Sequence, residues 1–263
     1  MPLLRKCPCL SLSAAVSALL ASCFGAGLAR AGDLVFLDQF EGPVAIPWVR
    51  QNSDFAAGAH FVIEPAIVTA TKLTNSNTKL TLFIQLPQNL APAPYPKWAA
   101  VEATGDAVGP SPAVGDCVRV SGTVTLFKGS TDVSAMTWTT ATPLDCANGI
   151  IVPTIVSLSD IATDTTAAES GNQPGPLSEA YESTLLTVLN TTSLTSAVNG
   201  AFAIYDGFSS STYLSVGGFL YPYSAVVSTH FSAVTGVLEE FDSLTDPVYL
   251  ILPRSAADVI VGL

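Results

Sequence analysis

The sequence contains little positive charge and few residues that commonly act as general bases. It has 10 Lys and Arg against 21 Asp and Glu, and its two histidines are His60 and His230. Nucleic-acid binding depends largely on basic residues that displace counterions from the phosphate backbone. The composition therefore disfavours direct nucleic-acid binding, although acidity also serves simply to keep a protein soluble.

The sequence also lacks the common motifs of hydrolase, nucleotide and zinc sites. It contains no GxSxG nucleophile elbow, no GxxxxGK[ST] phosphate loop and no HExxH zinc motif. His60 and His230 each precede a Phe in an alternating pattern, which favours a structural strand position over a general base. We assign no catalytic residue and no cofactor, and a non-enzymatic function is favoured.

No run of about 18 apolar residues follows the N-terminal region, so a later membrane-spanning helix is not predicted. The N-terminal region itself has the pattern of an export signal. Arg5 and Lys6 precede an apolar stretch that starts at Leu10 and contains no charge until Arg30. The protein is therefore expected to leave the cytoplasm, for the cell envelope or the extracellular space.

Two processing sites in this region compete. Leu20 to Cys23 resembles a lipobox, which would remove residues 1–22 and make Cys23 the lipidated first residue. Cleavage after Ala31 would instead remove residues 1–31 and leave 7 basic and 21 acidic residues, a net charge of −14. The lipobox leaves an apolar core of ordinary length, so it is favoured. Any membrane contact is then expected only through this lipid anchor.

Cysteine usage agrees with export. Of the five cysteines, Cys117 and Cys146 are the two that follow the signal region. Two thiols without neighbouring histidines do not complete a zinc site, whereas a pair in an oxidising compartment favours a disulfide. We predict this disulfide, worth about 3 kcal/mol in the chain-entropy model.

Four stretches recur in the same order along the chain, which indicates a duplicated unit of about 110 residues. The clearest match aligns VSGTVTLF, from Val120, with VTGVLEEF, from Val234. The matched stretches are short, rich in Val, Ile, Thr and Phe, and separated by turn signals. Each copy is therefore predicted to be all-β and, to avoid exposed sheet edges, to close into a barrel. The other matches pair residues 64–70 with 182–188, 82–85 with 201–206, and 152–161 with 252–260.

Two of these stretches resemble a known family. VGDCVRVSGTVTLFKGSTDVS, from Val114, and YESTLLTV, from Tyr181, are similar to OB-like domains that precede the catalytic domain in secreted bacterial nucleases of the endonuclease/exonuclease/phosphatase class. The resemblance covers most of residues 64–258 and implies an extracellular accessory module. It carries over no catalytic residue, so a nuclease or phosphoesterase domain would have to lie on another chain.

The expected fold is all-β, with two tandem OB-like, Greek-key β-barrel domains. The first barrel is predicted over residues 32–160 and the second over 181–263. Residues 161–180 are polar and rich in Thr, Ser, Gly and Pro, which is typical of a linker.

Two sets of residues are candidates for a binding site. Aromatic side chains on an OB-like barrel can stack against bases or sugars, although in β proteins they more often pack in the core. The acidic run near residue 240 could bind Ca²⁺, but it lacks the regular DxDxDG spacing, which favours a solvated loop. The expected partner is a protein or a glycan of the envelope or the extracellular space. The candidates are Trp98, Trp138, Tyr205, Tyr221 and Tyr223 for a ligand, and Glu239, Glu240, Asp242 and Asp246 for a metal.

Overall fold

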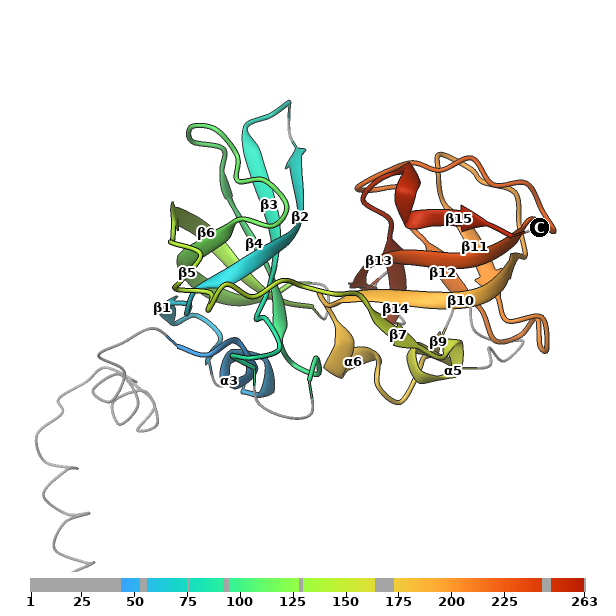
Figure 1. Cartoon of the computed structure of the whole chain (residues 1–263), viewed down its shortest axis with the longest axis horizontal. Coiled ribbons are helices and arrows are strands. Elements are labelled where there is room, and N and C mark those ends of the chain that lie inside the picture. The colour runs from blue at the N-terminus through green and yellow to red at the C-terminus, as the bar shows by residue number, and fades with distance from the viewer. Residues whose placement is uncertain are drawn as a thin grey trace, which may run out of the picture. The chain divides into compact units, whose positions relative to one another are not determined.

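The computed structural model describes residues 44–52, 56–74, 76–91, 95–127, 130–163, 173–242 and 247–262. The predicted export signal, its two processing sites and Cys23 lie outside these residues. Strands dominate the described chain, and most of them belong to two sheets (Figure 1). No helix among the described residues has the length and apolar character needed to span a membrane.

The first sheet contains a closed five-stranded β-barrel. Its strands pair in the order β5, β2, β3, β4 and β6, and β6 pairs back with β5. All of these pairs are antiparallel except β4 with β6, which run parallel. β1 pairs with the middle of β5, at residues 121–123. The strands are β1 (His60–Val62), β2 (Ala66–Thr74), β3 (Lys79–Gln85), β4 (Ala100–Asp106), β5 (Cys117–Phe127) and β6 (Ser130–Thr140).

The second sheet repeats this order of pairing. β13, β10, β11, β12 and β14 are neighbours in turn, and β14 pairs with β13. In this ring the parallel pair is β12 with β14. They are the third and fifth of its five strands in chain order, as β4 and β6 are in the first ring. The strands are β7 (Thr154–Val156), β10 (Leu185–Ser193), β11 (Phe202–Tyr205), β12 (Leu214–Val216), β13 (His230–Asp242), β14 (Pro247–Leu252) and β15 (Val259–Val261).

Short helical elements lie between and beside the sheets. α3 has Pro47 in its first turn. The backbone N–H groups of this turn have no partner within the helix, so the missing N–H of proline costs nothing. η1 is a single turn near the C-terminus, and α6 is a short helix that precedes β10. A small sheet pairs β8 with β9. The bounds are α3 (Ile46–Gln51), α5 (Leu158–Ile161), β8 (Ala162–Thr163), β9 (Gln173–Pro174), α6 (Ser178–Tyr181) and η1 (Ala256–Asp258).

Alternation of buried and exposed residues along β5 places one face of this strand inside the first barrel. On β5, Val118, Val120 and Val124 are fully buried while Arg119 between them is exposed. Side chains on successive strand residues point to opposite faces, so this pattern fills the barrel interior with valine. On β3 both faces are buried, because Leu82 lies in the first barrel and Phe83 packs with Leu185 and other residues of the second sheet.

The glycine at the centre of the repeated motif accommodates an irregularity in the neighbouring strand. Opposite Gly122, the register between β5 and β6 shifts by one residue, and Ala135 on β6 has a φ of 50°. A Cβ on Gly122 would lie 2.6 Å from the carbonyl oxygen of Ser134. The bulge therefore requires glycine here. In the similar stretch VTGVLEEF, a Cβ on Gly236 would lie 2.5 Å from the carbonyl oxygen of Leu252.

The predicted disulfide is present, with the Cα atoms of Cys117 and Cys146 6.0 Å apart. The bond does not join two neighbouring strands. β6 ends at Thr140, and Cys146 lies in the turns that follow, so the bond ties this segment to the start of β5. The physical reason is that Pro143 and the sequence DCANG, from Asp145, favour turns over a continued strand.

Candidate functional site

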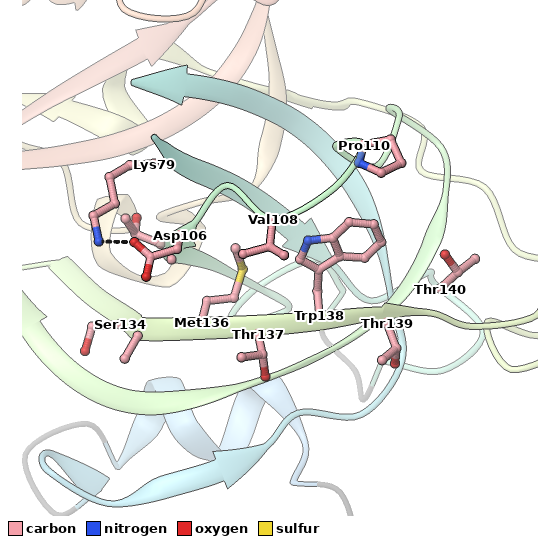
Figure 2. Close-up of a pocket in the computed structure, with 13 residues that line it drawn as sticks. Lys79, Asp106, Val108, Pro110, Ser134, Met136, Thr137, Trp138, Thr139 and Thr140 are labelled. Carbon is pink, nitrogen blue, oxygen red and sulfur yellow. Dashed lines mark hydrogen bonds and ion pairs between the residues drawn. The ribbon is translucent and has the colours of Figure 1, made fainter. Parts of the chain in front are cut away.

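A cleft opens in the first barrel where two paired strands separate (Figure 2). β4 ends at Asp106, and the last residue pair that joins it to β6 is Gly105 with Met136. β6 continues to Thr140, so its last residues extend past the end of β4. The resulting cavity has a volume of about 880 Å³. The bulge in β6 therefore lies at the beginning of this cleft.

The cleft has an apolar wall and a polar rim. Figure 2 shows the indole ring of Trp138 beside Val108 and Pro110, which belong to the segment after β4, with Met136 close by. The hydroxyl group of Thr140 lies on the same side of β6 as Trp138, whereas Figure 2 shows Thr137 and Thr139 on the opposite side of the strand. At one end Lys79 forms an ion pair with Asp106. A flat aromatic ring with a hydroxyl group on the same side can stack on an apolar ring face and hydrogen-bond to its edge.

A second groove is lined by residues of both sheets and is acidic. It has a volume of about 620 Å³, and its carboxylates come from Glu102, Asp132 and Glu239. Glu102 on β4 lies opposite Asp132 on β6 in the parallel pairing. Burial raises the pKa of Glu102 well above its usual value, and the nearby Asp132 adds to this rise. Burial likewise raises the pKa of Asp132 to about 8.

Hydrogen-bond geometry supports a protonated Asp132. The Ser130 hydroxyl oxygen lies 3.0 Å from Oδ1 of Asp132 and 2.7 Å from Oε1 of Glu182. One hydroxyl proton cannot be donated to both carboxylates. If Ser130 donates its proton to Glu182, the contact between Ser130 and Asp132 is a hydrogen bond when Asp132 is protonated and donates to the Ser130 oxygen. The acidic groove is thereby connected to a deeper charged cluster.

The deeper cluster is centred on Arg50, whose side chain is completely buried. α3 positions it, and its Nη1 lies 2.6 Å from Oε1 of Glu182, which is also fully buried. Its Nη2 donates to the backbone carbonyl of Glu179 at 2.6 Å, and its guanidinium lies 5.7 Å from the ring centroid of Trp98. Buried charges require partners of this kind, because isolated ions are costly to remove from water.

Glu240 on β13 and Tyr249 on β14 extend the cluster into the second sheet. The Tyr249 hydroxyl donates to Oε2 of Glu179 at 3.1 Å. Burial, followed by the charge of Glu182, raises the pKa of Glu240 to about 7, and burial also raises the pKa of Glu179. Carboxylates from α6 and β13 therefore meet around the single guanidinium of Arg50.

The structure separates the five aromatic candidates. Trp138 lines the cleft, whereas Trp98 stacks against Arg50 and its backbone N–H donates to Ala180. Tyr223 packs against the core rings of Phe202 and Phe231. Tyr205, at the end of β11, and Tyr221, after β12, are half-buried.

The four acidic candidates also separate. Glu239, Glu240 and Asp242 belong to β13 rather than to a loop, and Asp246 lies outside the described residues. Glu239 lines the acidic groove, while Glu240 is 8% exposed and lies with Glu179 and Glu182. Adjacent strand residues point to opposite faces, so Glu239 and Glu240 cannot share one metal site.

Sequence reasoning missed Arg50, Glu102, Asp132 and Glu182 as members of polar sites. The sequence does contain a pattern that indicates burial of Arg50. Together with Ile46, Pro47 and Val49 it forms one face of a helix, in a chain with few basic residues. The partners of Arg50 are 129 and 132 positions away in sequence and carry no local signal. Comparison of the chain with protein-family models and with curated proteins gives no match.

Proposed function

We propose that the chain is an exported, non-catalytic binding module built from two OB-like barrels, and that the Trp138 cleft binds a glycan. The observation that carries this proposal is the placement of Trp138 in a cleft of about 880 Å³, beside Val108 and Pro110 and on the same side of β6 as the hydroxyl group of Thr140. Sugars present apolar ring faces to aromatic side chains and hydroxyl groups to polar ones. Asp106 is the one carboxylate among the described residues of this cleft, and its ion pair with Lys79 favours binding over hydrolysis.

The OB-like assignment rests on the shared order of strand pairing. Both rings contain five strands, with the third and fifth parallel and the other neighbours antiparallel. The repeat supports a duplication, because β2 and β10, β3 and β11, and β5 and β13 each occupy the same place in their rings. The fourth sequence match does not follow this rule. Residues 154–156 form β7, which pairs with β10, whereas residues 259–261 form β15, which pairs with β13.

Export and lipid attachment belong to the same proposal. The disulfide between Cys117 and Cys146 is consistent with an oxidising compartment. A lipid on Cys23 would hold the module at the envelope, and cleavage after Ala31 would release it.

The accessory role beside a nuclease on another chain stays a prediction from the sequence resemblance. Fluorescence anisotropy with labelled single- and double-stranded DNA tests its simplest form, direct contact with nucleic acid. We expect no salt-sensitive binding, because acidic residues outnumber basic ones by 21 to 10. Salt-sensitive binding would favour the nuclease-accessory role over the glycan role.

The glycan proposal is tested by applying the purified full chain to a printed array of bacterial, plant and animal glycans. We expect binding to at least one class, and titration of that glycan should change the tryptophan fluorescence. Trp138→Ala should weaken binding at least tenfold, because the stacking surface is removed. Absence of binding across the array would overturn the proposal.

Phe208→Ala is the matched control. Phe208 is 94% exposed and does not line the cleft, so its removal deletes an aromatic ring without changing the proposed site. We expect unchanged glycan affinity. Equal losses in the two variants would show that binding depends on general surface hydrophobicity, against the assignment of the cleft. Circular dichroism of both variants checks that they fold.

A further inference from the structure

Three carboxylates converge where α6 meets the second barrel. Glu179 is on α6, Glu182 directly follows it, and Glu240 is on β13. One oxygen from each lies within 4.8 Å of the other two. Backbone hydrogen bonds hold the two segments together, since Leu238 donates to the carbonyl of Thr184 at 3.0 Å. The three side chains therefore belong to a rigid part of the fold.

Two oxygens of this cluster are buried and have no hydrogen-bond partner. They are Oε2 of Glu182 and Oε2 of Glu240, on side chains of residues that are 0% and 8% exposed. A buried carboxylate oxygen without a partner costs free energy, because it has lost its water and gained nothing in exchange. Both oxygens are therefore available to a ligand that supplies positive charge.

Arg50 contacts only some of the carboxylate oxygens of the cluster. Its Nη1 lies 2.6 Å from Oε1 of Glu182, which leaves Oε2 of the same carboxylate unpartnered. Ser130 and the backbone N–H of Thr131 also donate to Oε1. With all three carboxylates ionised, one guanidinium against three negative charges leaves a charge of −2. A single divalent cation would neutralise this remainder.

We propose that Glu179, Glu182 and Glu240 bind a Ca²⁺ ion. An all-oxygen donor set favours a hard cation over zinc, which prefers sulfur and nitrogen. Ca²⁺ accepts irregular geometry and a mixture of carboxylate and water ligands, whereas Mg²⁺ demands near-ideal octahedral coordination. The Glu179 side chain is 52% exposed, so solvent reaches the cluster from this side and can complete the coordination. This site is independent of the proposed glycan cleft.

Isothermal titration calorimetry of the purified full chain, stripped with EGTA and dialysed, tests the site with CaCl₂ as the probe. We expect binding of one ion per chain and a rise in the thermal unfolding temperature, because the ion binds the folded state. MgCl₂ should bind more weakly. Absence of both heat and a thermal shift with CaCl₂ would overturn the proposal.

Glu240→Gln and Glu239→Gln form a matched pair of variants. Each removes one negative charge from the same strand, but only Glu240 belongs to the cluster. Glu240→Gln should weaken Ca²⁺ binding at least tenfold, and Glu239→Gln should leave it unchanged. An equal effect of the two changes would indicate nonspecific attraction to an acidic surface and would refute the site.

Glu179→Gln keeps the test valid if Glu240→Gln does not fold. Glu179 is half-exposed, so its replacement should preserve the fold while it weakens Ca²⁺ binding. Wild-type affinity in a folded Glu179→Gln variant would contradict the proposed ligand set. Circular dichroism without the ion establishes the folding of each variant.

Discussion

The two rings share one order of strand pairing but secure the segment after their fifth strand in different ways. In the first ring, this segment is tied to the beginning of β5 by the disulfide between Cys117 and Cys146. In the second, the chain turns through η1 and pairs as β15 with the beginning of β13. A covalent bond and an added strand therefore meet the same structural need. The comparison teaches that topology constrains where a segment must be held but not by which interaction.

A second difference concerns buried charge. The buried carboxylates of the first barrel, Glu102 and Asp132, line the acidic groove, whereas Glu240 on β13 of the second ring lies with Glu179 and Glu182 in the cluster around Arg50. Such a cluster tolerates the removal of one partner poorly, because the remaining charge stays buried. The largest expected effect follows from this difference.

Arg50→Met should have the largest effect on stability. It removes the cation that neutralises buried Glu182, and we expect a loss of about 3–5 kcal/mol in the free energy of unfolding. Urea denaturation measures this loss. Arg119→Met, on an exposed position of β5, is the control and should change the value by less than about 0.5 kcal/mol. A small effect of Arg50→Met would mean that the cluster is not held together by its ion pairs.

Removal of the disulfide should have the next largest effect. The bond closes a sequence separation of 29 residues, so the double change of Cys117 and Cys146 to Ala should cost about 3 kcal/mol. Urea denaturation of the oxidised wild type and the double variant gives the difference. Equal stabilities would show that hydrogen bonds such as Ala141 N–H to the Cys117 carbonyl already hold the segment.

The corresponding feature of the second ring should contribute less. Asp258 accepts hydrogen bonds from the Arg254 guanidinium at 2.9 and 3.0 Å and from its backbone N–H at 2.8 Å, which positions η1 ahead of β15. Asp258→Asn should cost about 2 kcal/mol, because charged hydrogen bonds are replaced by weaker ones. Hydrogen exchange of the β15 amides should increase while that of β5 amides stays unchanged. Unaltered exchange in β15 would contradict this role.

A further effect is expected in the pH dependence of stability. The pKa of Asp132 is raised from 3.8 to about 8 by burial, so the folded state binds a proton that the unfolded state has released between these values. Stability from this group is therefore present below about pH 4 and declines as the pH rises toward 8, by at most about 1.4 kcal/mol per pH unit. The groups facing Asp132 are Glu102 on β4, Glu239 on β13, Glu182 after α6 and Arg50 on α3.

Urea midpoints measured from pH 4 to pH 8 test this decline. Asp132→Asn should flatten it, since the amide does not titrate. Asp106→Asn is the control, because Asp106 is exposed in its pair with Lys79 and its replacement should leave the slope unchanged. An identical slope in wild type and Asp132→Asn would indicate that Asp132 is ionised throughout.

Much of the strand order was accessible from sequence because local patterns encode it. β5, Cys117–Phe127, contains the stretch VSGTVTLF, whose composition predicts a strand. The end of β6 at Thr140 is less apparent from the sequence, because it depends on Pro143 and on the turn residues that follow it. Local preferences therefore place strands better than they place their ends.

The sequence by itself determined the β class and the pairing of Cys117 with Cys146, because periodicity and composition are properties of neighbouring residues. Only the tertiary structure decided which polar side chains meet. Arg50, Glu182 and Glu240 are far apart in sequence, and their contact depends on barrel closure and on the seating of α3 and α6. The Trp138 cleft likewise exists because β4 ends before β6, a mismatch between two strands that neither strand encodes alone.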